Sequence, residues 1–165
     1  MREISEETFE SITVFIRGLN EDQRADFMER IAEKQYHIYT YIHEFLEDEI
    51  SDKTSETTMY LLAIIIRCYE YEYGEFPAVS EERVNNYSDE KNTFIGQEMK
   101  RHSLGKIANG FKRAAGQRVL INHLEEIIAG NKNNPLGFED YEKMSIRAAI
   151  YLSIILLNEE MEKIL

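Results

Sequence analysis

Residues 59–66 read Met-Tyr-Leu-Leu-Ala-Ile-Ile-Ile, and residues 148–157 read Ala-Ala-Ile-Tyr-Leu-Ser-Ile-Ile-Leu-Leu. A helix at a protein surface keeps one polar face, so a helix that is apolar all round belongs in the middle of a core. Both runs are shorter than the roughly 18 residues that a membrane-spanning helix needs. They therefore predict two central helices, over about 56–73 and 139–163, with the remaining helices packed around them.

The sequence before the first apolar run carries the start and stop signals of helices. Ser5 can cap a first helix that ends at Gly18. The run Asn20-Glu21-Asp22-Gln23 is typical of a capping box. Apolar residues at helical spacing follow it, and they predict one helix from there to about Glu49. A polar break over 51–55 separates this helix from the first central one.

Between the two central helices, Ser80, Ser88 and Ser103 can each open a helix. The expected ranges are 81–87, 89–102 and 104–129, the last ending at Gly130. Residues 131–137 hold three Asn, one Pro and one Gly, which is typical of a loop. The fold class expected for residues 1–165 is therefore all-α, a single-domain bundle of six or seven helices.

Two parts of the chain resemble each other. Residues 35–46 align with residues 117–128 without a gap, so that Gln35 meets Gln117. Downstream, residues 60–66 align with residues 151–157 and share Tyr, Leu and Ile. This pattern predicts an internal repeat, 21–74 and 104–163, whose two helical hairpins form a four-helix core. The alternative is that two unrelated amphipathic helices share core positions, and the sequence leaves both interpretations open.

Composition and charge limit the classes of function. The chain has 165 residues, 43% apolar content and a formal net charge of −12, which is unfavourable for a general nucleic-acid or membrane binder. Cys68 is the only cysteine, so no intrachain disulfide can form, and the start of the chain lacks an apolar signal core. These features predict a cytoplasmic protein.

A basic window interrupts this acidic chain, because residues 99–124 contain no carboxylate. On a helical wheel several of its polar residues share one face, and three glycines beside them would let a phosphate or a partner backbone approach. The candidate anion- or partner-binding residues are Lys100, Arg101, Lys106, Asn109, Lys112, Arg113 and Arg118.

Two interpretations of the basic window remain open. Its cations can be solvated or paired with carboxylates of the same chain, as cations in the last turn of a helix often are. Alternatively, they form a basic face that binds an acidic protein partner or a second copy of this chain. Nucleic-acid binding ranks below both, since no stacking aromatic residues alternate with the cations.

The histidines do not form a metal site in this sequence. Glu33 and His37 are four residues apart, and His123 and Glu126 are three apart. A dimetal site in a helical bundle needs inward carboxylates from four helices, and the two apolar helices offer none. We therefore expect no bound metal, and His37, His43 and His123 at the boundary of the core. No cofactor-binding motif occurs, so no cofactor is expected.

The segment Arg118-Val-Leu-Ile-Asn-His123 resembles the Arg-x4-His motif of HEPN-type helical ribonucleases, which are also small α bundles. The resemblance covers six residues, and Val119 stands where that family usually has a polar residue. It implies RNA cleavage across a dimer, with Arg118 stabilising charge and His123 acting as general acid–base.

The leading functional hypothesis from the sequence is a non-enzymatic interaction or regulatory protein. It would act through the basic helix expected at 104–129 and through the acidic surface of the N-terminal hairpin, and a homodimer is one form of this association. The alternatives are the HEPN-like ribonuclease and a phosphate- or nucleic-acid-binding module.

Overall fold

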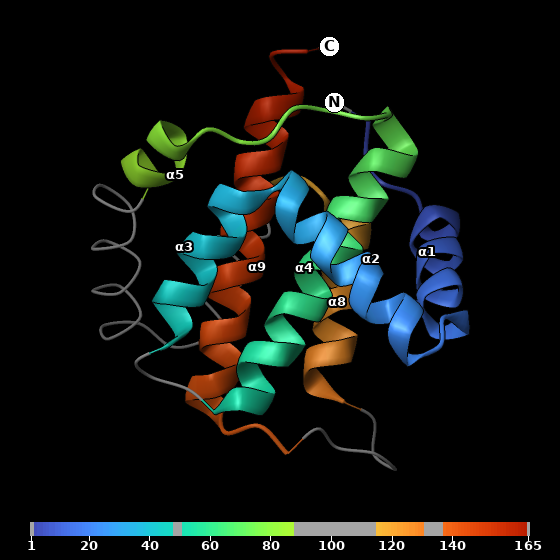
Figure 1. Ribbon diagram of the computed structural model, residues 1–165, viewed down its shortest axis with the longest axis vertical. Helices are drawn as coiled ribbons and strands as arrows, with labels where there is room; N and C mark the ends of the chain where they lie inside the picture. Colours follow the sequence, from blue (N-terminus) through green and yellow to red (C-terminus); the bar gives the residue numbers. More distant parts are fainter. Residues whose placement is uncertain (1, 48–50, 88–114, 131–136, 165) are drawn as a thin grey trace.

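The computed structural model describes residues 2–47, 51–87, 115–130 and 137–164. Within these ranges the chain forms seven helices and no strand, which confirms the all-α fold class (Figure 1). The helices are α1 (Glu6–Gly18), α2 (Glu21–Lys34), α3 (Tyr36–Glu47), α4 (Asp52–Tyr73), α5 (Glu81–Tyr87), α8 (Arg118–Ala129) and α9 (Asp140–Met161).

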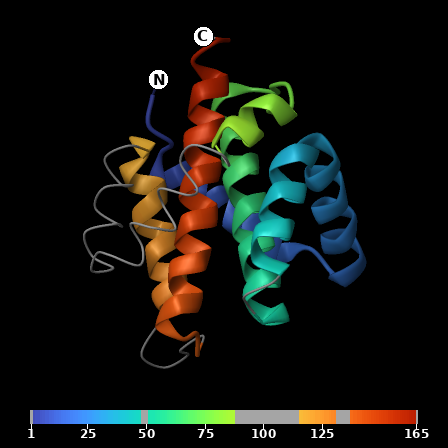
Figure 2. The same cartoon turned by 90° about the vertical axis from the view of Figure 1, so that its left-hand side faces the viewer.

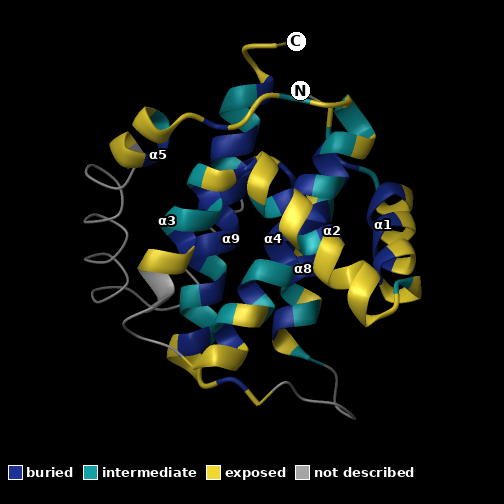
Figure 3. Ribbon diagram, in the orientation of Figure 1, coloured by how far each residue is buried: buried dark blue, intermediate teal, exposed yellow. Residues whose placement is uncertain are grey.

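The two apolar runs form α4 and α9, which lie side by side and run in the same direction through the middle of the molecule (Figure 1). Every residue from 61 to 66 is fully buried, and so are most residues of the second run. Figure 3 shows exposed residues on the outer sides of α1 and α2 instead. Burial of their apolar surface thus places α4 and α9 in the middle of the molecule, as the sequence predicted.

The other helices pack around α4 and α9. Helix α3 runs antiparallel to α4, and α8 runs antiparallel to α9, so that each central helix belongs to a hairpin (Figures 1 and 2). Helix α1 packs on α4 and α8, α2 packs on α4 and α3, and α5 packs on α3. All seven helices contribute side chains to one cluster of buried apolar residues.

Polar contacts join α4 and α9 where both helices begin. The Glu142 carboxylate accepts hydrogen bonds from Ser51 Oγ and Thr54 Oγ1, both at 2.9 Å, and from the Glu139 backbone N–H at 2.9 Å. The bond from the Glu139 N–H is the largest cause that lowers the pKa of Glu142, followed by the two hydroxyls. Near the other end of the pair, the Tyr69 hydroxyl donates to Asn158 Oδ1.

Several predicted helix signals are confirmed. The Thr8 N–H donates to Ser5 Oγ at 3.1 Å. The capping box of Asn20 and Gln23 is complete, with bonds of 2.9 and 3.0 Å. Helix α1 ends at Gly18 and α8 ends just before Gly130. The predicted helix 89–102 lies outside the described residues.

Three predicted boundaries are wrong. The helix expected from Asn20 to Glu49 is two helices, separated at Gln35, whose side chain binds another segment. The first central helix begins at Asp52 because Ser51 caps it. The helix expected over 104–129 does not continue through Gly116, whose φ of 64° is left-handed and not helical.

Candidate functional site

Helix α2 carries most of its charge away from the core. Only Phe27 and Ile31 are buried, because they lie on the stripe that packs against the bundle. The remaining positions of this helix are mostly exposed and rich in carboxylates. A helix with a narrow apolar stripe presents a wide polar face to solvent.

An open groove of about 580 Å³ lies between this helix, α3 and α4. Its walls combine an apolar floor with carboxylates at the rim. The lining residues are Glu29, Ala32, Glu33, Tyr36, Tyr39, Thr40, His43, Glu44 and Met59. We call this feature the acidic groove.

The carboxylates of the acidic groove are available for binding. Glu29, Glu33 and Glu44 are exposed, and within the described part of the chain none of them has a hydrogen-bond or ion-pair partner. Tyr36 stands beside them with 61% of its surface exposed. Negative charges near one another favour a cationic ligand, because such a ligand relieves their mutual repulsion.

The floor of the acidic groove is fixed by packing. The Tyr39 hydroxyl donates a hydrogen bond of 3.3 Å to the backbone carbonyl of Met59, which ties α3 to α4. Burial raises the pKa of Tyr39, so this hydroxyl stays protonated and acts as a donor at neutral pH. The floor therefore offers apolar contact and no ionised group.

Two cations close to this region, Lys34 and Arg67, are already paired. Lys34 Nζ lies 2.8 Å from Glu70 Oε1, and Arg67 lies 2.9 Å from the other oxygen of Glu70. The hydrogen bond to Glu70 is the main cause that raises the pKa of Lys34. Glu70 is thus neutralised within the chain, in contrast to the three carboxylates of the acidic groove.

Such a groove suits a cationic amphipathic segment. The methylene groups of Lys or Arg side chains can cover the apolar floor while their charges reach the carboxylates at the rim. The exposed ring of Tyr36 can also receive a cation on its face.

The residues of the predicted basic site fall mostly outside the described part of the chain. This applies to Lys100, Arg101, Lys106, Asn109, Lys112 and Arg113. The seventh, Arg118, is the first residue of α8, and its side chain is 80% exposed. Its Nε lies 3.8 Å from Glu3 Oε1, and that oxygen also accepts the Val119 N–H at 3.1 Å. Arg118 is therefore near a carboxylate of its own chain.

His123 lies at the boundary of the core. Its ring stacks on Phe9 with centroids 4.6 Å apart, and its nitrogens lie 3.9 Å from carboxylate oxygens of Glu6 and Glu126. His37 is also partly buried, whereas His43 is exposed on the acidic groove. The contacts of His123 and Arg118 in the described residues are thus with separate carboxylates, and the ribonuclease activity implied by their spacing stays a prediction.

Two further features concern metals and the cysteine. The described residues contain no group of three or more His, Cys, Asp or Glu side chains arranged to hold a metal ion. Cys68 is fully buried, and burial is the main cause that raises the pKa of its thiol to about 12. A thiol with this pKa is not a nucleophile at neutral pH.

None of the helices in the described ranges is both long and apolar enough to cross a membrane.

The sequence indicated the acidic character of the N-terminal hairpin but not its groove. Their spacing in the sequence would place Glu33 and His37 on one helix face. The helix break at Gln35 separates them, and Glu33 lines the groove. The signal available in the sequence was the excess of carboxylates over 21–47, where seven carboxylates stand against three cations. No protein-family model, curated protein or solved structure matches this chain.

Proposed function

We propose that this protein is a non-enzymatic interaction module whose acidic groove binds a cationic protein segment. The observation that carries this proposal is the unpaired state of Glu29, Glu33 and Glu44, among the described residues, beside the exposed ring of Tyr36. The net charge of −12 would attract a cationic partner over a longer range and raise its association rate.

The occupant that we propose is the part of the basic window that precedes α8, residues 99–114, of a second copy of this chain. Residues 99–114 supply five cations and no carboxylate, a composition that complements the acidic groove. An acidic surface and a basic segment on one chain allow two copies to associate head-to-tail or around a two-fold axis. Such a contact lies near the surface, so salt would weaken it.

The test uses a labelled synthetic peptide of residues 99–114 and the full-length protein. At low ionic strength we expect saturable binding by fluorescence anisotropy, with an affinity that falls as salt is raised to about 0.5 M. The double variant Glu33→Lys/Glu44→Lys should bind the peptide at least about tenfold more weakly, because two attractions become repulsions.

The matched control reverses two carboxylates outside the groove, Glu10→Lys and Glu162→Lys. Both residues are exposed, and the control protein carries the same net charge as the groove variant. We expect the control to bind the peptide within about twofold of the original protein. Equal weakening in both variants would show a general charge effect and reject the groove as the site.

Light scattering on the full-length protein then decides the occupant. A mass that rises with concentration at low salt, and falls in the groove variant, supports association of two copies. If the protein is a monomer at all concentrations but still binds the peptide through the groove, the occupant is another basic protein and not a second copy of this chain. Absence of peptide binding at low salt would overturn the proposal.

A further inference from the structure

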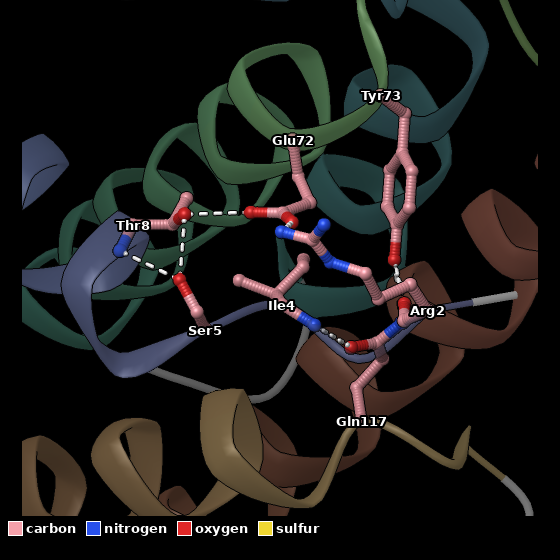
Figure 4. Close-up of polar contacts among 7 residues, drawn as sticks. All are labelled: Arg2, Ile4, Ser5, Thr8, Glu72, Tyr73 and Gln117. Atoms are coloured by element: carbon pink, nitrogen blue, oxygen red, sulfur yellow. Dashed lines mark hydrogen bonds and ion pairs between the residues drawn. The ribbon is translucent and has the colours of Figure 1, made fainter.

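A buried glutamine holds the segment that leads into α1. Gln117 is only 2% exposed, and its Oε1 accepts the Ile4 N–H at 2.8 Å while its Nε2 donates to the Arg2 carbonyl at 3.5 Å. Figure 4 shows this side chain reaching the extended backbone of residues 2–4, beside Tyr73. The amide thus binds two backbone groups of one non-helical segment, two residues apart.

A second buried glutamine holds the segment that leads into α5 in the same way. Gln35 is also 2% exposed, its Oε1 accepts the Val79 N–H at 3.0 Å, and its Nε2 donates to the Pro77 carbonyl at 3.3 Å. The donor, the acceptor and their spacing of two residues are the same as at Gln117. We call residues 2–4 and 77–79 the first and second straps.

The two straps continue into similar sequences. Ile4-Ser5-Glu6-Glu7 corresponds to Val79-Ser80-Glu81-Glu82. Ile4 and Val79 are both fully buried. The serine that follows each caps the next helix, through the Thr8 N–H at 3.1 Å in α1 and the Arg83 N–H at 3.4 Å in α5. The resemblance therefore extends upstream of the repeat seen in the sequence.

Each strap is bound by the half of the chain to which it does not belong. The first strap precedes α1 but is held by Gln117, which directly precedes α8. The second strap precedes α5 but is held by Gln35, which directly precedes α3. Accordingly, α1 packs on α8 and α5 packs on α3. The contacts are reciprocal.

The helices that follow the glutamines correspond as well. Helices α3 and α8 have 12 residues each, and α4 and α9 have 22 residues each. The two 22-residue helices run parallel and adjacent (Figures 1 and 2). A two-fold axis along a parallel pair exchanges its members, and residues bound across such an axis occur in reciprocal pairs.

We infer that the chain consists of two related units, beginning at the first and the second strap, which exchange these straps across an approximate two-fold axis. Gln35 and Gln117 are then equivalent binding sites for an extended segment with an apolar residue followed by Ser-Glu-Glu. The molecule has the organisation of a symmetric dimer joined in one chain. This inference is independent of the acidic groove.

A glutamine suits this role for a physical reason. A strap that crosses between helices has no neighbouring strand, so its backbone N–H and C=O groups would be buried without partners. A side-chain amide supplies an acceptor oxygen and a donor nitrogen in one plane, so it can pair with both an N–H and a C=O of the strap. An unpaired buried N–H is unfavourable, which favours the same residue at both sites.

The test transplants the second strap into the position of the first within the full-length protein. The variant Arg2→Pro/Glu3→Ala/Ile4→Val places the sequence of residues 77–79 at residues 2–4. Because the backbone N–H of residue 4 can still donate to Gln117, we expect a folded protein in which the amide of residue 4 exchanges within about tenfold of the original rate. NMR hydrogen exchange measures this rate.

The matched control contains the same three residues in another order, Arg2→Ala/Glu3→Val/Ile4→Pro. Proline at position 4 has no N–H to donate, and the valine no longer occupies the buried position of the strap. We expect the control to melt at a lower temperature than the transplant. Equal loss of stability in both variants, or failure of both to fold, would overturn the equivalence of the two sites.

A second measurement uses substitutions at the glutamines. Gln117→Met and Gln35→Met approximately retain the volume but remove both hydrogen bonds to the strap, and Gln117→Met also removes a bond of 3.3 Å to the Tyr73 hydroxyl. We expect exchange at the Ile4 amide in the first variant, and at the Val79 amide in the second, to rise roughly tenfold. Unequal behaviour, with one strap amide unaffected by its variant, would also overturn the inference.

Discussion

The first and second straps are bound through their backbones in the same way, but their side chains make different contacts. Arg2 of the first strap forms an ion pair with Glu72, and Glu3 accepts a hydrogen bond from the Val119 N–H at 3.1 Å. After the second strap, Arg83 instead lies 2.7 Å from Glu159. The buried amide, the buried apolar residue and the serine that caps the next helix are common to both sites.

This difference indicates which interactions fix the architecture. The Arg2 side chain is 78% exposed, and an exposed ion pair contributes about 0–1 kcal/mol. Leaving a buried backbone N–H or C=O group without a hydrogen-bond partner costs more free energy than losing this ion pair. The buried Ile4 and Val79 side chains also stabilise the fold, because their apolar surface is removed from water. Contacts with a large free energy are shared by the two sites, whereas weak surface contacts differ.

The largest expected effect comes from the apolar residue of each strap. Ile4→Ala should lower the free energy of unfolding by about 2–5 kcal/mol, because it leaves a cavity in a fully buried site. Val79→Ala removes fewer methyl and methylene groups and should cost about two-thirds as much. Urea denaturation followed by circular dichroism measures both values. A cost below about 0.5 kcal/mol at either residue would contradict the equal anchoring of the straps.

A smaller effect is expected from a contact between α8 and α9. The Arg147 guanidinium donates to both oxygens of Glu125 at 2.7–2.9 Å, and the Tyr151 hydroxyl donates to the same carboxylate. Arg147→Met removes this bidentate, largely buried ion pair and should cost about 1–3 kcal/mol. The shift should appear in the denaturation midpoint.

The matched control for this contact is Glu56 in α4. When residues 60–66 are aligned with 151–157, Glu56 takes the position of Arg147, and Glu56 is exposed. Glu56→Met should change stability by no more than about 0.5 kcal/mol. If both substitutions cost the same, the two units do not differ at this position.

The smallest expected effect concerns acid stability at the start of α4 and α9. The folded state lowers the pKa of Glu142, mainly through the Glu139 N–H and then the hydroxyls of Thr54 and Ser51. A lowered folded pKa stabilises the protein above the unfolded pKa of about 4.3, and this contribution is lost as the pH falls through the folded pKa.

Thermal melting at about pH 6 and about pH 3 measures this contribution. The melting temperature of the original protein should fall more between these two values than that of Glu142→Gln, which does not titrate there. Ser51→Ala removes one hydroxyl that donates to the carboxylate. Its decrease in melting temperature between the two pH values should be intermediate between those of the original protein and Glu142→Gln. An equal pH dependence in the original protein and in Glu142→Gln would show that this carboxylate does not contribute.

The sequence predicted most of the fold through local signals. The apolar runs predicted the central helices, Ser5 and Asn20 marked the starts of α1 and α2, and Gly130 marked the end of α8. These features depend on residues that are close along the chain, such as a hydroxyl and an N–H three positions later. Such signals can be identified without knowing which helices meet.

The candidate site was less accessible to sequence analysis. The density of carboxylates in the N-terminal hairpin was visible, but Glu29 and Glu44 become neighbours only because the chain breaks between α2 and α3. That break follows from Gln35, and glutamine by itself is a good helix former. Nothing near Gln35 in the sequence indicates that its side chain binds a backbone segment 44 residues away.

The sequence by itself thus determined the all-α class, the central position of α4 and α9, and most helix ends, because hydrophobic periodicity and capping act over one or two turns. Only the tertiary structure decided the breaks at Gln35 and Gly116, the reciprocal binding of the straps, and the acidic groove. These depend on buried polar groups that must find partners far along the chain, and local propensity is weaker than that requirement.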